Sequence, residues 1–299
     1  MYKYSYETFR RSIFVEKLLE QTCSSAYWLG FIFADGWFDF KRYSIGVHVS
    51  EKDKEHLTEL CSFINSELYK NAWVTSGFKA SGSMVRTTKR NTEVFNKLVS
   101  EYGIQPKKTY NPPLNLTSKL EQMTDDMFLS FMIGFFDGDG SLVSVPSQNS
   151  LTMRFQNHIS WEFLLTYFEY RVYKIFTYNK NAILTRAVTT KNGNKTAMLS
   201  FARYALINDI CSKTKTLNLP VLNRKWKKVD IFLQHRQNKL KANQKTSKRN
   251  IWWLDDEIDL LICNHIHMSV AEIQKQFFPN RSYSSICGKL QMLRRIGKV

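Results

Sequence analysis

The sequence predicts an α+β protein built from two similar halves, each with the element order αββαββα, followed by a small all-α unit. Two apolar segments, AYWLGFIFADG at 26–36 and SFMIGFFDGDG at 130–140, resemble each other and indicate an internal repeat. Alternating patterns typical of strands and amphipathic patterns typical of helices follow each segment. A basic stretch at 236–250 separates the two halves from the C-terminal unit.

The first half spans residues 25–118, after an N-terminal extension at 1–24. Beyond the apolar helix, the expected elements are a strand at 43–49, a helix at 53–68, strands near 72–78 and 83–88, and a helix at 91–103. Ser50 and Asp53 approximate a capping box for the earlier helix. Asn91 is expected to cap the later helix and Gly103 to end it.

The second half spans residues 119–235 and repeats this pattern. Its expected elements are a strand at 151–157, a helix at 160–170 that Ser160 caps, a hairpin turn at Asn192-Gly193, and a helix at 203–213. An Asn-Gly pair favours a tight hairpin because both residues accept positive φ. The two halves therefore predict the same fold twice.

The C-terminal part divides into a linker and a helical unit. Residues 236–250 carry many basic side chains, no acidic one and few apolar ones, which predicts a flexible basic linker. In residues 251–299, helical patterns at 255–263, 270–277 and 282–293 have the size of a helix-turn-helix unit.

The charge of the chain indicates its partner. The 299 residues carry a formal net charge of +17, and a protein this basic usually binds a polyanion, with nucleic acid favoured over an acidic membrane surface. The longest apolar run is about nine residues, whereas a bilayer span needs ~20. Residues 1–19 lack a secretory pattern, so we expect an intracellular protein, in the cytoplasm or nucleoid of a bacterial or phage-infected host, or in an organelle.

The cysteines do not indicate a disulfide framework or a zinc site. The five cysteines are far apart and include no C-x-x-C pair, which predicts reduced thiols. His265 and His267 lie beside Cys263, but side chains two positions apart diverge on a helix, and no second ligand pair follows.

The repeated apolar segments carry the clearest chemistry. Each places two small residues four positions apart, on one helical face where another backbone can approach closely: Gly30 and Ala34, and Gly134 and Gly138. Packing of these faces would bring Asp35 and Asp139 together at the helix ends. Adjacent carboxylates need a positive neighbour, and hard oxygen ligands favour Mg²⁺, which can activate water for phosphodiester hydrolysis.

WLGFIFADG and MIGFFDGDG resemble the two LAGLIDADG motifs of single-chain homing endonucleases, and the likeness covers about residues 26–228. The resemblance implies two saddle-shaped antiparallel sheets related by a pseudo-two-fold axis, and a monomer that acts as a pseudo-dimer on double-stranded DNA. It also implies that Asp35 and Asp139 bind metal together with the carbonyls of Ala34 and Gly138. The expected cofactor is Mg²⁺, with Mn²⁺ as a substitute.

The first motif has Phe33 where the family motif has an acid, whereas the second motif has Asp137 at this position. We therefore expect Asp137 to be structural. The resemblance further implies a basic residue near the active site in EYGIQPKKTYNPP and in LNLPVLNRKWKK. The matching catalytic candidates are Lys108 and Lys225, which could offset developing charge or orient an attacking water, with Lys107 and Lys227 as alternatives.

DNA contacts are expected on the polar faces of the strands. Alternation in LTMRFQN separates three apolar side chains from three polar ones, and a polar strand face can read the major groove. The base-contact candidates are Thr152, Arg154 and Gln156, with His48, Arg86 and Thr88 in the first half. Lys191, Lys195 and the basic linker suit phosphates. A solvent-facing role explains any single one of these residues equally well.

The tail, from WLDDEIDLLICNH to NRSYSSICGKLQMLRRIG, is similar to small Myb/SANT-like helix-turn-helix domains. The resemblance implies that the last helix enters a major groove, with Ser282, Tyr283, Ser285 and Lys289 near DNA. A protein–protein role is the alternative for this unit.

Two other functions remain open for the whole chain. The first is an RNA-binding maturase that assists splicing of a group I intron, with intron RNA as partner. The second is a DNA-binding regulator that has lost cleavage. The presence of both Asp35 and Asp139 favours the endonuclease.

Overall fold

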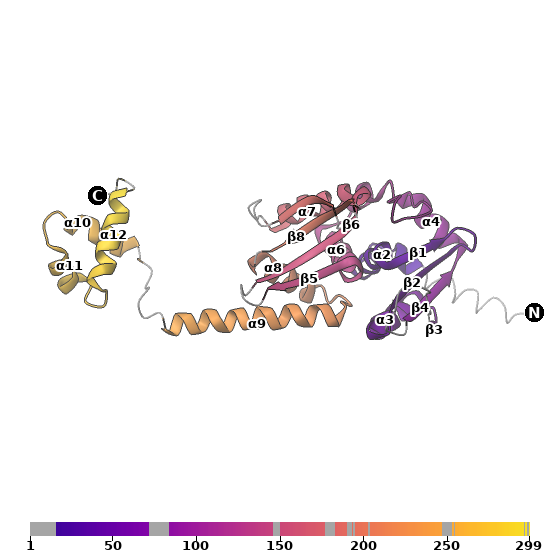
Figure 1. Cartoon of the computed structure of the whole chain (residues 1–299), viewed down its shortest axis with the longest axis horizontal. Coiled ribbons are helices and arrows are strands. Elements are labelled where there is room, and N and C mark those ends of the chain that lie inside the picture. The colour runs from indigo at the N-terminus through magenta and orange to yellow at the C-terminus, as the bar shows by residue number, and fades with distance from the viewer. Residues whose placement is uncertain are drawn as a thin grey trace, which may run out of the picture. The chain divides into compact units, whose positions relative to one another are not determined.

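The computed structural model describes residues 16–71, 84–145, 150–176, 183–189, 193, 195–202, 204–246, 253, 255–295, 297 and 299. The chain forms two compact units, Met1–Leu233 and Gln234–Val299 (Figure 1). The larger unit is an α+β structure with two antiparallel sheets, and the smaller one is helical. The fold class is therefore as the sequence predicts.

The first half of the larger unit contains one four-stranded sheet in the order β1-β2-β4-β3. A short 3-10 helix, η1 (Glu16–Leu19), precedes it. Its elements are α2 (Cys23–Asp35), β1 (Gly36–Asp39), β2 (Ser44–Ser50), η2 (Glu51–Asp53), α3 (Lys54–Ile64), β3 (Leu68–Asn71), β4 (Met84–Arg90) and α4 (Thr92–Tyr102).

The second half repeats this arrangement, with a sheet in the order β5-β6-β8-β7. Its elements are α5 (Leu116–Glu121), α6 (Asp125–Asp139), β5 (Gly140–Val145), β6 (Ser150–His158), η4 (Ile159–Trp161), α7 (Glu162–Phe176), β7 (Ile183–Thr189), β8 (Lys195–Phe201), α8 (Tyr204–Thr216) and the first part of α9 (Asn223–Thr246), which continues past Leu233.

Helix ends follow the expected signals at α4 and depart from them at α3. Asn91 Oδ1 accepts a hydrogen bond from the Val94 N–H, and Gly103 ends α4 with φ +67°. The capping box of Ser50 and Asp53 is wrong, because η2 intervenes and neither side chain caps a helix. The Asp53 carboxylate instead accepts two hydrogen bonds from Arg224.

Strand boundaries also differ in places. β1 and β5 follow the motif helices directly and are too short or too close to the helix to show a separate pattern. The strand expected at 72–78 lies outside the described residues, and β3 precedes it. In the second half, η4 comes before α7, so Ser160 does not cap that helix. Gly193, between β7 and β8, has φ +77°, as the hairpin prediction requires.

Helices α2 and α6 cross with their backbones in contact at the centre of the larger unit (Figure 1). A Cβ added to Gly30 would lie 2.0 Å from the Phe131 carbonyl oxygen, and one added to Gly134 would lie 1.9 Å from that of Tyr27. No side chain fits at either position. The predicted close approach of the two small-residue faces is confirmed.

The core surrounds this crossing and is rich in aromatic side chains. Phe33 packs against Phe131, and Phe135 against Phe168, with ring centroids 5.8 and 5.7 Å apart. Helices α3 and α7 pack on their sheets. Each sheet therefore has one face in the core.

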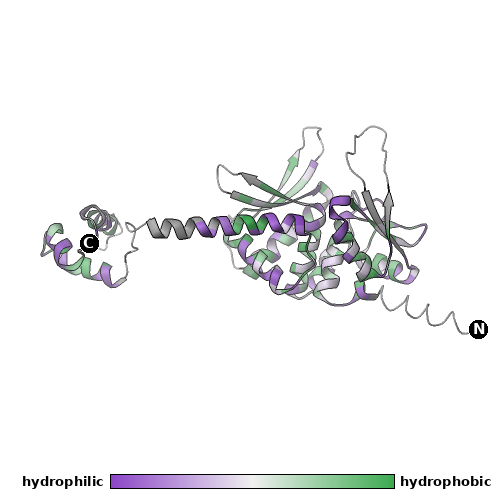
Figure 2. Cartoon of the chain, turned by 90° about the horizontal axis from the view of Figure 1, so that it is seen from below, coloured by the Kyte–Doolittle hydropathy of each residue, from purple (hydrophilic) through white to green (hydrophobic). Residues whose placement is uncertain are grey.

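The flexible linker predicted at 236–250 is wrong for residues 236–246, because helix α9 continues to Thr246. Trp226, Val229 and Leu233 are buried at helical spacing and fix its first part on the core. Figure 2 shows apolar and polar segments alternating along this part. A helix started there can propagate, since residues 234–246 contain no Gly or Pro.

Across the described part of the chain, no helix has both the length and the apolar character needed to cross a membrane.

The smaller unit contains α10 (Asp255–Asn264), α11 (Val270–Phe277) and α12 (Tyr283–Arg295), close to the expected positions. Its core includes Leu261, Ile273 and Ile286. Arg281 is buried, pairs with Glu257 through two guanidinium nitrogens, and lies 4.1 Å above the Trp253 ring. Arg281 therefore joins the start of this unit to its last helix.

We expect Gly134→Ala to lower the free energy of unfolding of the larger unit by roughly 3 kcal/mol or more, because the new methyl group would collide with backbone atoms. Thermal and denaturant unfolding measure this change. Gly288→Ala is the control, since Gly288 lies in α12 with no atom within 4 Å of its added Cβ. Equal stability of Gly134→Ala and wild type would contradict the backbone contact.

Candidate active site

Asp35 and Asp139 lie together where α2 and α6 end. Each is the last residue of its helix, and the glycine that follows begins a strand. A Cβ added to Gly138 would lie 2.4 Å from Ala34 Cβ and 3.4 Å from Asp35 Cγ. The crossing of the two helices therefore holds both acids at one small site.

The two carboxylates interact electrostatically. Burial among protein atoms raises the pKa of Asp35 to about 6, and the negative charge of Asp139 adds to the rise, although the side chain retains an exposed edge. Burial also raises the pKa of Asp139, while a hydrogen bond from Asn157 acts in the opposite direction. Such a pair is stabilised by a nearby cation.

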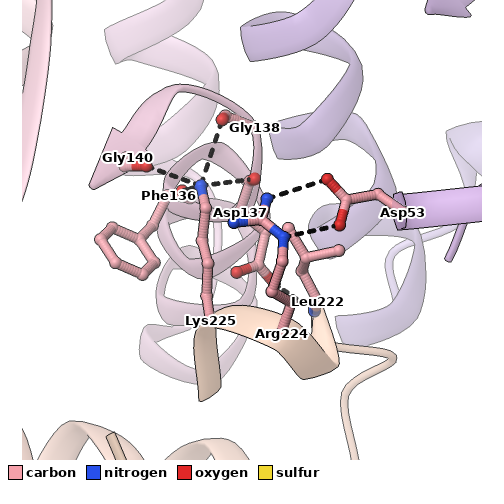
Figure 3. A network of polar contacts seen from close by, with 8 residues as sticks. All are labelled: Asp53, Phe136, Asp137, Gly138, Gly140, Leu222, Arg224 and Lys225. Atoms are coloured by element: carbon pink, nitrogen blue, oxygen red, sulfur yellow. Dashed lines mark hydrogen bonds and ion pairs between the residues drawn. The ribbon is translucent and has the colours of Figure 1, made fainter. Parts of the chain in front are cut away.

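Each helix end is capped by a lysine from a distant segment. Lys108 Nζ donates to the carbonyl oxygens of Ile32, Phe33, Ala34 and Gly36. Lys225 Nζ donates to those of Phe136, Asp137, Gly138 and Gly140, at 2.6–3.2 Å (Figure 3). Each Lys225 acceptor lies 104 positions after a Lys108 acceptor, the shift that also relates Asp35 to Asp139.

This geometry gives the two predicted lysines a specific role. A cation at a helix C-terminus stabilises the last carbonyls of the helix, and here each ammonium has four backbone carbonyl oxygens within hydrogen-bond distance. Burial lowers the pKa of Lys108 to about 8, against the charges of Asp139 and Asp35, and it also lowers the pKa of Lys225. The alternatives Lys107 and Lys227 are exposed. The lysines thus fix the carbonyls of Ala34 and Gly138, the expected additional metal ligands.

Asp137 is structural, as its mismatch with Phe33 predicts. The side chain is buried and accepts hydrogen bonds from Tyr27 Oη at 2.7 Å, the Leu222 N–H at 2.8 Å and Trp226 Nε1 at 2.9 Å. Three donors from two other segments satisfy one carboxylate. Asp137 therefore ties α6 to α2 and to the start of α9.

His56 extends this network into α3. Its Nε2 lies 3.2 Å from Tyr27 Oη, and its ring packs against Trp28 and Phe31. Burial lowers the pKa of His56 to about 4, with Asp53 opposing the shift and Lys225 adding to it. The imidazole is therefore neutral near pH 7.

The chain segments that carry Lys108 and Lys225 are each bound to the other half of the larger unit. Arg224, beside Lys225, forms a bidentate ion pair with Asp53 of η2 at 2.8 and 2.9 Å (Figure 3). Beside Lys108, the Thr109 carbonyl accepts a hydrogen bond from Trp161 Nε1 of η4 at 3.0 Å. Each lysine thus caps a helix of its own half while its neighbour is bound to the other half.

A cavity of about 510 Å³ opens beside Asp139 and includes Lys108, Ser141, Asn157 and His158 in its lining. Asn157 Nδ2 donates to Asp139 Oδ2 at 2.8 Å. Asn157 was not among the predicted site residues. The sequence signal for Asn157 was its position in the strand alternation. It is a polar residue on the strand face of the buried Leu151, Met153 and Phe155.

The DNA-contact candidates of the second half share the open face of β6. Thr152 and Arg154 are half-buried and Gln156 is exposed, while the residues between them are buried. Gln156 Nε2 donates to Thr196 Oγ1 at 3.1 Å. Lys195 is exposed at the start of β8, whereas Lys191 lies outside the described residues.

In the first half, His48 occupies the position that matches Gln156. The sheet registers establish this, because Gly36 pairs with Val47 and Gly140 pairs with Phe155. His48 pairs with Arg86, and Gly46 with Thr88, across β2 and β4. Residues directly opposite in an antiparallel pair share a face, so the three candidates lie on one side of this sheet.

The candidates of the smaller unit lie at the start of α12. Ser282 Oγ accepts a hydrogen bond from the Ser285 N–H, so Ser282 caps this helix. Ser282 and Tyr283 are exposed, and Ser285 and Lys289 are half-buried. The four side chains therefore remain on or near the surface.

The donor set at the helix junction suits a hard cation. Among the described residues, no cluster of three or more His, Cys, Asp and Glu side chains can hold a metal ion. Two carboxylates with nearby carbonyls leave further positions for water and for phosphate oxygens, which is how Mg²⁺ usually binds. Asp35 and Asp139 thus fit the expected cofactor in chemistry and charge.

Comparisons with known proteins find similarity to solved structures. No protein-family model and no curated protein matches the sequence. One similar solved structure is the N-terminal LAGLIDADG domain of DUF199/WhiA, with 17% identity and a TM-score of 0.41 over 69% of this chain and 89% of that chain. Another is the homing endonuclease I-WcaI bound to its DNA recognition sequence, with 10% identity and a TM-score of 0.46 over 73% and 88%.

We expect Lys225→Met to lower the free energy of unfolding by roughly 2–4 kcal/mol, because buried carbonyls lose their donor. Lys227→Met is the matched control, since Lys227 is exposed on the same helix. Denaturant unfolding of both variants measures the difference. If the two variants were equally stable, the capping role of Lys225 would be wrong.

We expect the free energy of unfolding to decrease by up to about 3 kcal/mol as the pH falls from about 6.5 to about 4, relative to His56→Gln. The unfolded chain binds a proton at His56 first, because the pKa of His56 is lower in the folded state. Urea unfolding at several pH values measures both proteins. Parallel pH profiles would contradict a neutral, buried His56.

Proposed function

We propose that this chain is a metal-dependent, site-specific double-strand DNA endonuclease of the LAGLIDADG homing type. The observation that supports the proposal most strongly is the pair of equivalent aspartates, Asp35 and Asp139, at the junction of two packed helices. The matching lysine caps show that the duplication extends to the backbone of both helix ends. Two equivalent acidic positions suit two cuts, one in each DNA strand.

In this function, Asp35 and Asp139 would hold Mg²⁺ or Mn²⁺ with the carbonyls of Ala34 and Gly138. The bound metal would supply an activated water and would stabilise charge on the phosphate. Lys108 and Lys225 keep the carbonyls in place, and Asn157 orients the carboxylate of Asp139. These residues therefore position ligands.

Double-stranded DNA would lie across the two sheets. The open face of one sheet carries His48, and the open face of the other carries Gln156, each with polar neighbours. A polar strand face can contact base edges in the major groove. The net charge of +17 favours phosphate binding throughout the chain. Because both halves lie in one chain, a monomer would suffice.

The smaller unit would extend the contact with DNA. Its last helix carries Lys289, Arg294 and Arg295, whereas α10 carries Asp255, Asp256 and Asp259. This division of charge favours α12 as the helix that approaches a phosphate backbone.

We expect the wild type to cut a library of long random or genomic duplexes at discrete sites in both strands when Mg²⁺ is present. Asp35→Asn and Asp139→Asn should each lose cleavage by at least about a thousandfold, because each removes a metal-binding charge. EDTA should abolish cleavage by the wild type. Sequencing of the cut ends measures position and stagger.

The alternatives give different results in this experiment. Reproducible binding of duplex DNA without cutting would indicate a regulator, and preferential binding of structured intron RNA would indicate a maturase. Cleavage that persists in both aspartate variants would contradict the assigned site.

A further inference from the structure

His158 lines the cavity beside Asp139. It is the last residue of β6 and the N-cap of η4. Its Nδ1 accepts a hydrogen bond from the Ser160 N–H at 3.3 Å and lies 2.9 Å from Ser160 Oγ. Because a backbone N–H can only donate, Nδ1 must be the acceptor and the proton of a neutral ring lies on Nε2.

The ring orientation is set from both halves. Tyr110, two residues after Lys108, lies edge-on to the His158 ring with centroids 5.0 Å apart and an angle of 75°. Among the described residues, no protein group is hydrogen bonded to Nε2. The imidazole thus presents a fixed N–H that is available to a ligand.

The other side-chain nitrogen donors of this cavity each have at least one acceptor within the protein. The Lys108 ammonium donates to backbone carbonyls, and the amides of Gln156 and Asn157 each donate to a side-chain oxygen. His158 continues the open-face row of β6, two positions beyond Gln156, at the end of the strand nearest Asn157 and Asp139. A phosphate oxygen near Asp139 would therefore meet this N–H.

The first half lacks this group. The sheet registers match Val47 with Phe155, and the same count matches Ser50 with His158. The Ser50 side chain makes no cap hydrogen bond and is too short to extend over the site as an imidazole does. The two sides of the proposed active site therefore differ at this position.

We propose that His158 positions the DNA on the second-half side of the cut by donating from Nε2 to a phosphate oxygen, so that the two strands are cut at unequal rates. The inference rests on the proposed function. It adds a substrate-positioning residue that only one half supplies.

The test is His158→Asn, because Asn Oδ1 can keep the N-cap bond from the Ser160 N–H while the distal N–H is lost. Each strand of a duplex containing the cleavage site is labelled separately. We expect His158→Asn to cut one strand at least about tenfold more slowly than the wild type does, because a hydrogen bond to a charged group is lost. The cleavage rate of the other strand should be unchanged. His235→Asn, at an exposed position on α9, is the control for loss of a histidine.

A second measurement separates this inference from the proposed function. In metal-free binding experiments, the phosphates of the duplex are ethylated one at a time. At one position, ethylation should weaken DNA binding by the wild type but not by His158→Asn. That result supports the inference even if the wild type does not cut. Unchanged strand rates, equal slowing of both strands, or identical ethylation patterns would overturn it, as would a wild type that binds no duplex.

Discussion

The backbone contact between α2 and α6 is the constraint on which the rest of the structure depends. Gly30 and Gly134 let the two helices approach until no side chain fits between them. That distance brings Asp35 and Asp139 into one electrostatic pair and fixes the spacing of the two sheets that follow them. Because the contact is between backbones, its geometry tolerates little variation.

Around this contact, the duplication is strict in the backbone and loose in the side chains. The lysine caps contact equivalent carbonyls in both halves. In contrast, the position of Asp137 is occupied by Phe33 in the first half, and that of His158 by Ser50. Backbone positions carry the shared chemistry of the helix ends. Side chains can then differ between halves, as an asymmetric target would require.

The sequence predicts those features that depend on local pattern. The glycine spacing indicates the helix pair, Asn91 and Gly103 mark the ends of α4, and alternation identifies the open face of β6. The acceptors of Lys108 and Lys225 could not be predicted, because main-chain carbonyls carry no sequence signal. The helical part of 236–246 was also missed, since its stability derives from the core contacts of the preceding turns.

The crossed anchoring of the two lysine segments limits how the halves can be recombined. A chimera that combines one half with a foreign partner would separate Asp53 from Arg224 and Thr109 from Trp161. The incoming half would then leave the capping lysine poorly held, even with an intact motif helix. Domain exchange in this fold therefore requires grafting these contact pairs together with the halves.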